Sequence, residues 1–89
     1  MGERGGVEAE FTVEPFVVGR PGPHVLAALD ACEDPGVVVE HGPFGTRLLG
    51  ADGDVAEVLG RMIRAAMEAG ASRVTVQVQR DICSAGVGG

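Results

Sequence analysis

Several residue types that carry common chemistries are missing from this chain of 89 residues. It contains no Lys, Tyr or Trp, and all seven of its basic residues are Arg. Proteins that read RNA on an open sheet stack the bases on aromatic side chains. The net charge of −6 also repels phosphate backbones. We therefore expect no nucleic-acid partner.

Motifs for metals and nucleophiles are missing as well. The two cysteines, Cys32 and Cys83, form no CxxC pair and no zinc or iron–sulfur spacing. Neither serine has a base at a meaningful spacing for nucleophilic catalysis. His24 and His41 fit ordinary surface positions better than proton-transfer roles. We expect no cofactor, no metal site and no enzymatic activity, with Cys32 buried and Cys83 an exposed free thiol.

No apolar run approaches the roughly 18 residues that a membrane-spanning helix requires. The N-terminal residues 1–6 are polar and glycine-rich and lack a hydrophobic signal segment, so we expect a cytoplasmic protein with no membrane partner. Residues 1–6 and 82–89 are expected to be flexible ends of a single domain over 7–81. Such a small core is marginal, which favours self-association as a dimer or tetramer.

Apolar periodicity predicts two helices and four strands. Residues 7–16 alternate between apolar and polar, which is typical of a half-buried strand. The full order is a strand at 7–16, a helix from 23 through 32, strands at 37–41 and 46–49, a helix from 54 to 69 and a strand at 74–79. Asp54 with Glu57 predicts a capping box, and Gly70 a helix C-terminus.

This βαββαβ order predicts an α+β, ferredoxin-like fold, in which both helices cover one face of an antiparallel four-stranded sheet. Function is then expected on the open face. That face should present Glu8, Glu10, Thr12, Glu14, Val38, Glu40, Thr75, Gln77 and Gln79.

The carboxylates on the open face have two interpretations. They form a solvated polar surface, or one or two of them bind a cation or an aminopyrimidine edge. Carboxylates only accept hydrogen bonds, so they suit N–H donors and positive charge. Glu14 and Glu40 are the candidates for such an acceptor.

The connector Phe44-Gly45-Thr46 also has two interpretations. In the first it is a hairpin loop, with Gly45 at positive φ and Phe44 covering the edge of the core. In the second, Gly45 lets a ligand approach the backbone, Thr46 forms a hydrogen bond with it and Phe44 packs on its ring. The local chemistry favours the first.

Four segments in order make the chain resemble the small thiamine-binding protein family, long described only as a domain of unknown function. They are Phe11-Thr12-Val13-Glu14-Pro15, Gly42-Pro43-Phe44-Gly45-Thr46, Gly50 with the acidic stretch 52–57, and the stretch 68–74 followed by Asp81. The resemblance covers roughly residues 7–81 and rests on the four segments together.

The resemblance implies a ferredoxin-like fold, paired or tetrameric assembly, and non-enzymatic binding of thiamine or its hydroxymethylpyrimidine moiety. By position it implies ligand contacts for Thr12, Phe44, Gly45 and Thr46. Glu14 replaces an aromatic or aliphatic residue of some relatives, which favours hydrogen bonding there over stacking. The alternative is an oligomeric interaction protein whose open sheet faces stack without a ligand.

Overall fold

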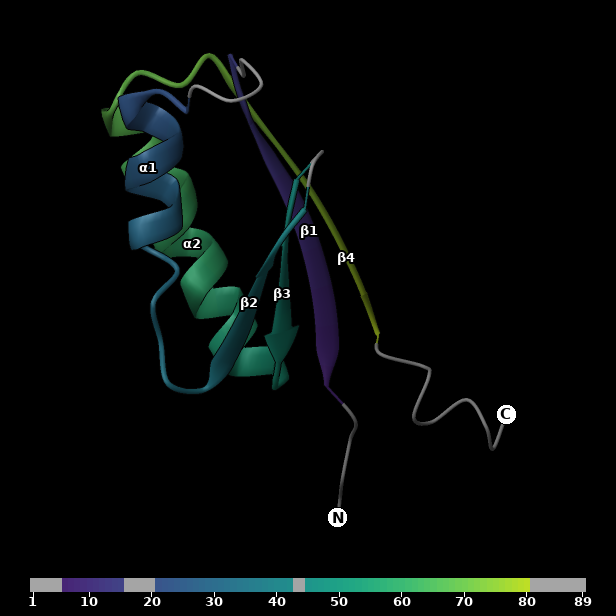
Figure 1. Cartoon of the computed structure of the whole chain (residues 1–89). Helices are drawn as coiled ribbons and strands as arrows, with labels where there is room; N and C mark the ends of the chain where they lie inside the picture. Colours follow the sequence, from purple (N-terminus) through teal and green to yellow (C-terminus); the bar gives the residue numbers. More distant parts are fainter. Residues whose placement is uncertain (1–5, 16–20, 43–44, 81–89) are drawn as a thin grey trace.

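The computed structural model describes residues 6–15, 21–42 and 45–80. Its element order confirms the predicted ferredoxin-like α+β fold (Figure 1). The elements are β1 (Val7–Glu14), α1 (Pro23–Asp30), β2 (Val37–His41), β3 (Thr46–Gly50), α2 (Asp52–Glu68) and β4 (Arg73–Arg80).

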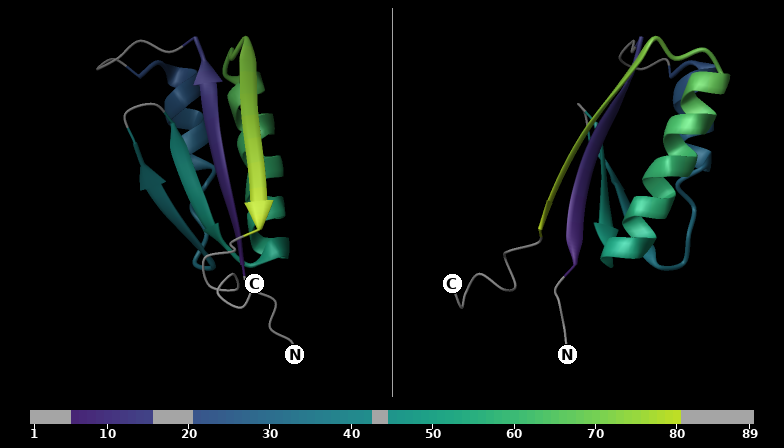
Figure 2. Two further views of the ribbon diagram at one scale, coloured as in Figure 1. Left: turned by 90° about the vertical axis from the view of Figure 1, so that its right-hand side faces the viewer. Right: turned by 180° about the vertical axis from the view of Figure 1, so that it is seen from behind.

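The four strands form one antiparallel sheet in the order β2-β3-β1-β4. β1 is central and pairs with β4 along its whole length, from Val7 opposite Arg80 to Glu14 opposite Arg73. Both helices lie on one face of the sheet, and within the described ranges no element covers the other face (Figure 2). Neither helix is long and apolar enough to cross a membrane.

The core lies between the sheet and the helices. Ala9 and Phe11 of β1 and Leu48 of β3 are at most 3% exposed. They pack with the apolar stripe of α2, of which Val58 and Met62 are fully buried. The period-two and helical patterns of the sequence therefore converge on one hydrophobic layer.

Two predictions about helix ends are wrong. α2 begins at Asp52 after Ala51, so Asp54 lies in its first turn and no side chain caps the helix. Both aspartates are still favourable there, because the helix dipole stabilises negative charge at the N-terminus. α1 ends at Asp30, which leaves Cys32 in the following turn. The chain tightens at that point because the Cys32 N–H bonds to the Leu29 carbonyl, only three residues back.

The end of α2 agrees with the sequence. Gly70 follows the last helical turn with φ of +105°, the left-handed conformation that favours glycine. The chain then enters β4, and both the N–H and the hydroxyl of Ser72 donate to the carbonyl of Glu14, at 2.8 and 3.1 Å. These bonds join the end of β1 to the start of β4.

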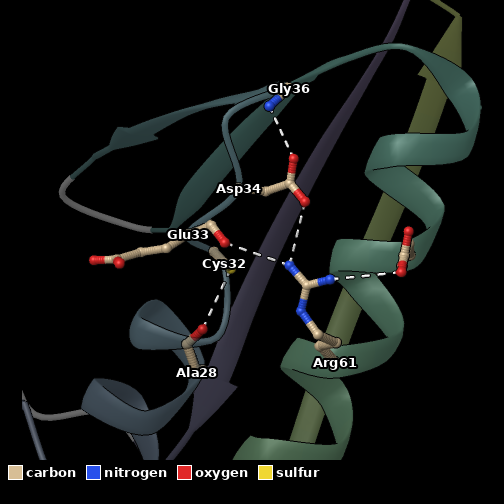
Figure 3. Close-up of polar contacts among 7 residues, drawn as sticks. Ala28, Cys32, Glu33, Asp34, Gly36 and Arg61 are labelled. Atoms are coloured by element: carbon tan, nitrogen blue, oxygen red, sulfur yellow. Dashed lines mark hydrogen bonds and ion pairs between the residues drawn. The ribbon is translucent and has the colours of Figure 1, made fainter.

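Arg61 of α2 ties the helix to the turn that precedes β2 (Figure 3). Its guanidinium donates to the Glu33 carbonyl at 3.4 Å and lies 3.5 Å from Asp34 Oδ2 and 3.8 Å from Glu57 Oε2. The other Asp34 oxygen accepts the Gly36 N–H at 2.8 Å. This arrangement, which we call the Arg61 clamp, positions the start of β2.

Cys32 lies beside the Arg61 clamp and is fully buried, as predicted (Figure 3). Its Sγ lies 3.2 Å from the Ala28 carbonyl, to which the thiol donates. Burial raises the pKa of the thiol from 9.0 to about 11, and the positive charge of Arg61 offsets part of that increase. Cys83 lies outside the described residues.

Candidate functional site

The strand register builds a charged row across the middle of the open face. Glu40 on β2 lies opposite Arg47 on β3, and Arg47 lies opposite Glu10 on β1. Glu10 in turn lies opposite Gln77 on β4. Directly opposed residues have Cβ atoms about 4.5–5.5 Å apart, so these four side chains are neighbours on one surface.

Arg47 bridges two carboxylates of this face. Its Nη2 lies 2.9 Å from Glu8 Oε2 on β1, and its Nη1 lies 3.6 Å from Glu40 Oε1 on β2. Its Nε is buried and has no hydrogen-bond partner in the described part of the chain. The positive charge of Arg47 is thus shared between two acidic neighbours.

Glu10 differs from the other two carboxylates around Arg47. It is exposed and occupies the position directly opposite Arg47, yet no ion pair or hydrogen bond joins its carboxylate to another described residue. A carboxylate carries about four acceptor positions. Those of Glu10 are therefore available to solvent or to a ligand.

A hollow of about 430 Å³ lies over this row and opens to solvent. Its volume is within the 300–1,000 Å³ range that is usual for small-molecule sites. It is lined by Glu10, Phe11, Thr12, Glu40, His41, Gly42, Gly45, Arg47, Thr75 and Gln77. We call this region the open-face hollow.

Gly45 brings the β2–β3 connection close to β1 at the edge of the hollow. A Cβ on Gly45 would lie 3.0 Å from the Phe11 carbonyl oxygen and 3.2 Å from the Thr12 methyl. The φ angle of Gly45 depends on Phe44, which lies outside the described residues, so the expectation of positive φ at Gly45 stays a prediction. Close strand packing explains the glycine, and the Gly42 N–H closes the hairpin by donating to the Gly45 carbonyl at 2.8 Å.

The structure places the six residues proposed from the sequence in different surroundings. Thr12, Glu40 and Gly45 line the open-face hollow. Glu14 belongs to the open face but lies outside the hollow, opposite Arg73. Phe44 lies outside the described residues.

Thr46 does not lie on the open face, where a contact with a ligand in the hollow would require it. It lies opposite Phe11 and His41 on the helix-covered side, where it is 8% exposed. The open-face position of β3 next to it belongs to Arg47. Thr46 therefore does not line the hollow.

Several lining residues were not singled out from the sequence as site residues. Glu10, Thr75 and Gln77 were expected on the open face, but their proximity to Arg47 depends on the register. The available signal was the one charged residue of the strand at 46–49, Arg47. His41 lines the edge of the hollow, whereas His24 does not; the latter contacts the Pro15 carbonyl.

The chemistry of the hollow suits a polar ligand with N–H donors or positive charge. Glu10 and Glu40 contribute two negative charges and Arg47 one positive charge. Thr12 and Thr75 add hydroxyls that both donate and accept hydrogen bonds. Across the described ranges, no group of three or more His, Cys, Asp and Glu side chains is placed to hold a metal ion.

Comparisons with known proteins give structural neighbours only. No family model and no curated protein matches the sequence. A domain of unknown function, DUF77, from Bacillus cereus superposes with a TM-score of 0.61 and 27% identity, over 82% of this chain and 71% of its own. This similarity supports the family resemblance drawn from the sequence.

Two further structures show the same fold. A Thermotoga maritima protein, assigned provisionally to thiamine biosynthesis or salvage, has a TM-score of 0.60 and 23% identity over 82% of this chain and 78% of its own. A Streptococcus pneumoniae protein has a TM-score of 0.54 and 22% identity over 82% of this chain and 81% of its own. At these identities the likeness is one of fold.

Proposed function

We propose that this protein binds thiamine or a thiamine-derived pyrimidine without transforming it, as a cytoplasmic carrier, buffer or sensor. One observation carries the proposal: the open-face hollow places the carboxylate of Glu10, which has no partner among the described residues, beside the hydroxyls of Thr12 and Thr75. The proposal is for binding and not for catalysis.

The ligand chemistry matches these groups. Thiamine has a positively charged thiazolium ring and an aminopyrimidine with N–H donors and ring-nitrogen acceptors. A carboxylate accepts from the amine or lies beside the cation, and threonine hydroxyls donate to the ring nitrogens. The resemblance to the small thiamine-binding family and the provisional assignment of the Thermotoga maritima neighbour agree with this choice.

Titration calorimetry and thermal unfolding with thiamine and with hydroxymethylpyrimidine test the proposal. A ligand at a hundredfold excess over Kd stabilises the folded state by about 2.7 kcal/mol. Each neutral hydrogen bond contributes about 0.5–1.5 kcal/mol. We therefore expect Thr12→Val to weaken binding by about three- to tenfold.

Thr46→Val is the matched control for Thr12→Val. It makes the same substitution, but on the helix-covered side of the sheet. We expect it to leave Kd unchanged within about twofold. Absence of both heat and thermal shift for the parent with either compound would exclude the proposed ligands.

A second candidate function is self-association through the open face, as a dimer or tetramer. Val38 lies on this face and is 59% exposed, and its neighbour in the register is Leu49. Exposed apolar side chains on an uncovered sheet favour contact with another subunit. Light scattering of the parent and of Val38→Glu tests it: we expect an oligomer that the variant weakens, and a monomeric parent would rule the candidate out.

A further inference from the structure

Arg47 is the one arginine among the described residues that line the open-face hollow, and its guanidinium already pairs with two carboxylates. Its terminal nitrogens lie 2.9 Å from Glu8 and 3.6 Å from Glu40, and its Nε is shielded from solvent. A phosphate group on a ligand would have to compete with these two carboxylates for the guanidinium. Arg47 is therefore a poor receptor for an anion.

Glu10 presents the opposite situation in the same row. Its carboxylate lines the hollow and has no partner among the residues that the structure describes. Among the described lining residues, Glu10 and Glu40 bring two carboxylates and Arg47 brings one guanidinium, so negative charge exceeds positive charge there. A positively charged ligand is attracted into a hollow with a net negative lining, and a phosphate group is repelled from it.

We propose that Glu10 is the residue that selects the charge of the ligand in the open-face hollow, and that the ligand is an unphosphorylated, positively charged compound. This inference rests on the proposed function and adds two statements to it. The acceptor for the ligand is Glu10, in place of the Glu14 or Glu40 that the sequence favoured. Phosphate esters of the same compound bind less tightly.

Calorimetric titration with thiamine and with thiamine monophosphate tests the inference. We expect the parent to bind thiamine at least about tenfold more tightly than its monophosphate. A charge-assisted hydrogen bond corresponds to about a 10- to 100-fold change in Kd. Glu10→Gln should therefore weaken thiamine binding by about that factor. It should also bring the Kd values of thiamine and thiamine monophosphate closer together.

Glu14→Gln is the matched control. Glu14 lies on the same strand and the same face, and the substitution removes the same charge, but Glu14 is outside the hollow. We expect it to change Kd by less than about threefold, through the long-range field alone. Thermal unfolding of both variants without ligand checks that each one folds.

The outcomes separate this inference from the function on which it rests. Suppose that the parent binds thiamine but Glu10→Gln raises the Kd for thiamine no more than Glu14→Gln does. The assignment of Glu10 is then overturned and the binding function stands. Equal or tighter binding of the monophosphate overturns the charge selection. If the parent binds neither compound nor hydroxymethylpyrimidine, both the function and this inference are wrong.

Discussion

The two faces of the sheet are built from the same strands but have different roles. On the helix-covered face, Phe11 and Leu48 are almost completely buried. On the open face, Glu10 and Arg47 occupy the intervening positions and line a solvent-open hollow. Successive side chains of a strand point to opposite faces, so stability and binding are assigned to alternate residues of one segment. Substitutions of adjacent residues should therefore separate the two roles.

Arg61 and Arg47 show the same contrast between stability and binding. Arg61 contacts Asp34 and Glu57 and joins α2 to the turn before β2, two segments that no ladder connects. Arg47 contacts Glu8 and Glu40, which belong to strands that the ladder already holds together. The contacts of Arg61 are thus expected to affect stability, whereas those of Arg47 mainly set the charge of the hollow.

Leu48→Ala and Leu49→Ala should give the largest difference between the two faces. Leu48 is fully buried against the helices, and Leu49 is half-buried on the open face. Removing a buried leucine side chain costs about 2–5 kcal/mol, because the lost burial and the cavity add together. We expect Leu49→Ala to cost clearly less. Urea unfolding of both variants measures the difference, and equal losses would contradict the assignment of faces.

The buried thiol of Cys32 predicts an alkaline loss of stability. Its pKa is about 11 in the folded protein and 9.0 ordinarily. Between these values the unfolded chain has lost the proton that the folded protein retains, so the free energy of unfolding falls as pH rises from 9 to 11. The chain has no Lys or Tyr to titrate in that window. Urea unfolding at pH 8.5 and pH 11 should show this loss.

Cys32→Ala is the control for the alkaline effect. It removes the buried thiol and keeps every other ionisable group, Cys83 included. We expect a smaller loss of stability between pH 8.5 and pH 11 in this variant than in the parent. An equal loss in both proteins would show that Cys32 titrates normally.

Arg61→Gln should have a smaller effect that is confined to stability. The ion pairs of the Arg61 clamp are partly exposed, and such pairs contribute about 0.2–1 kcal/mol. Arg64→Gln is the control, because Arg64 is an exposed residue of the same helix outside the clamp. Chemical unfolding should give Arg61→Gln a lower free energy of unfolding than Arg64→Gln. Equal stabilities would mean that the clamp contributes nothing measurable.

The fold was predictable because its signals are local. Alternation over 7–14, the apolar stripe of α2 and Gly70 each specify their element without reference to the rest. The start of α2 and the end of α1 were not predictable. Asp54 could cap a helix that begins after it, but it lies equally well in the first turn of a helix that begins at Asp52. The end of α1 depends on hydrogen bonds around Cys32 that residue types do not encode.

The candidate site was predictable only in part, because it depends on register. In β3, the alternation fits either Thr46 with Leu48 or Arg47 with Leu49 on the core face. A shift of one residue exchanges the two faces. Pairing with Phe11 and His41 decides in favour of Thr46 on the core side, and it brings Arg47 to Glu10. The sequence alone could not show that Arg47 pairs with Glu8 and Glu40, or that Glu10 has no partner within the described part of the chain.

Locating the bound ligand tests most directly whether thiamine binds in the open-face hollow. Amide signals of the 15N-labelled protein, followed by NMR during titration with thiamine, report the location residue by residue. We expect the largest shifts at Glu10, Thr12 and Thr75, with little change at Ala28 and Met62 behind the sheet. Saturable shifts that are largest on the helices would contradict a site on the open face, and an unchanged spectrum at millimolar thiamine would contradict thiamine binding itself.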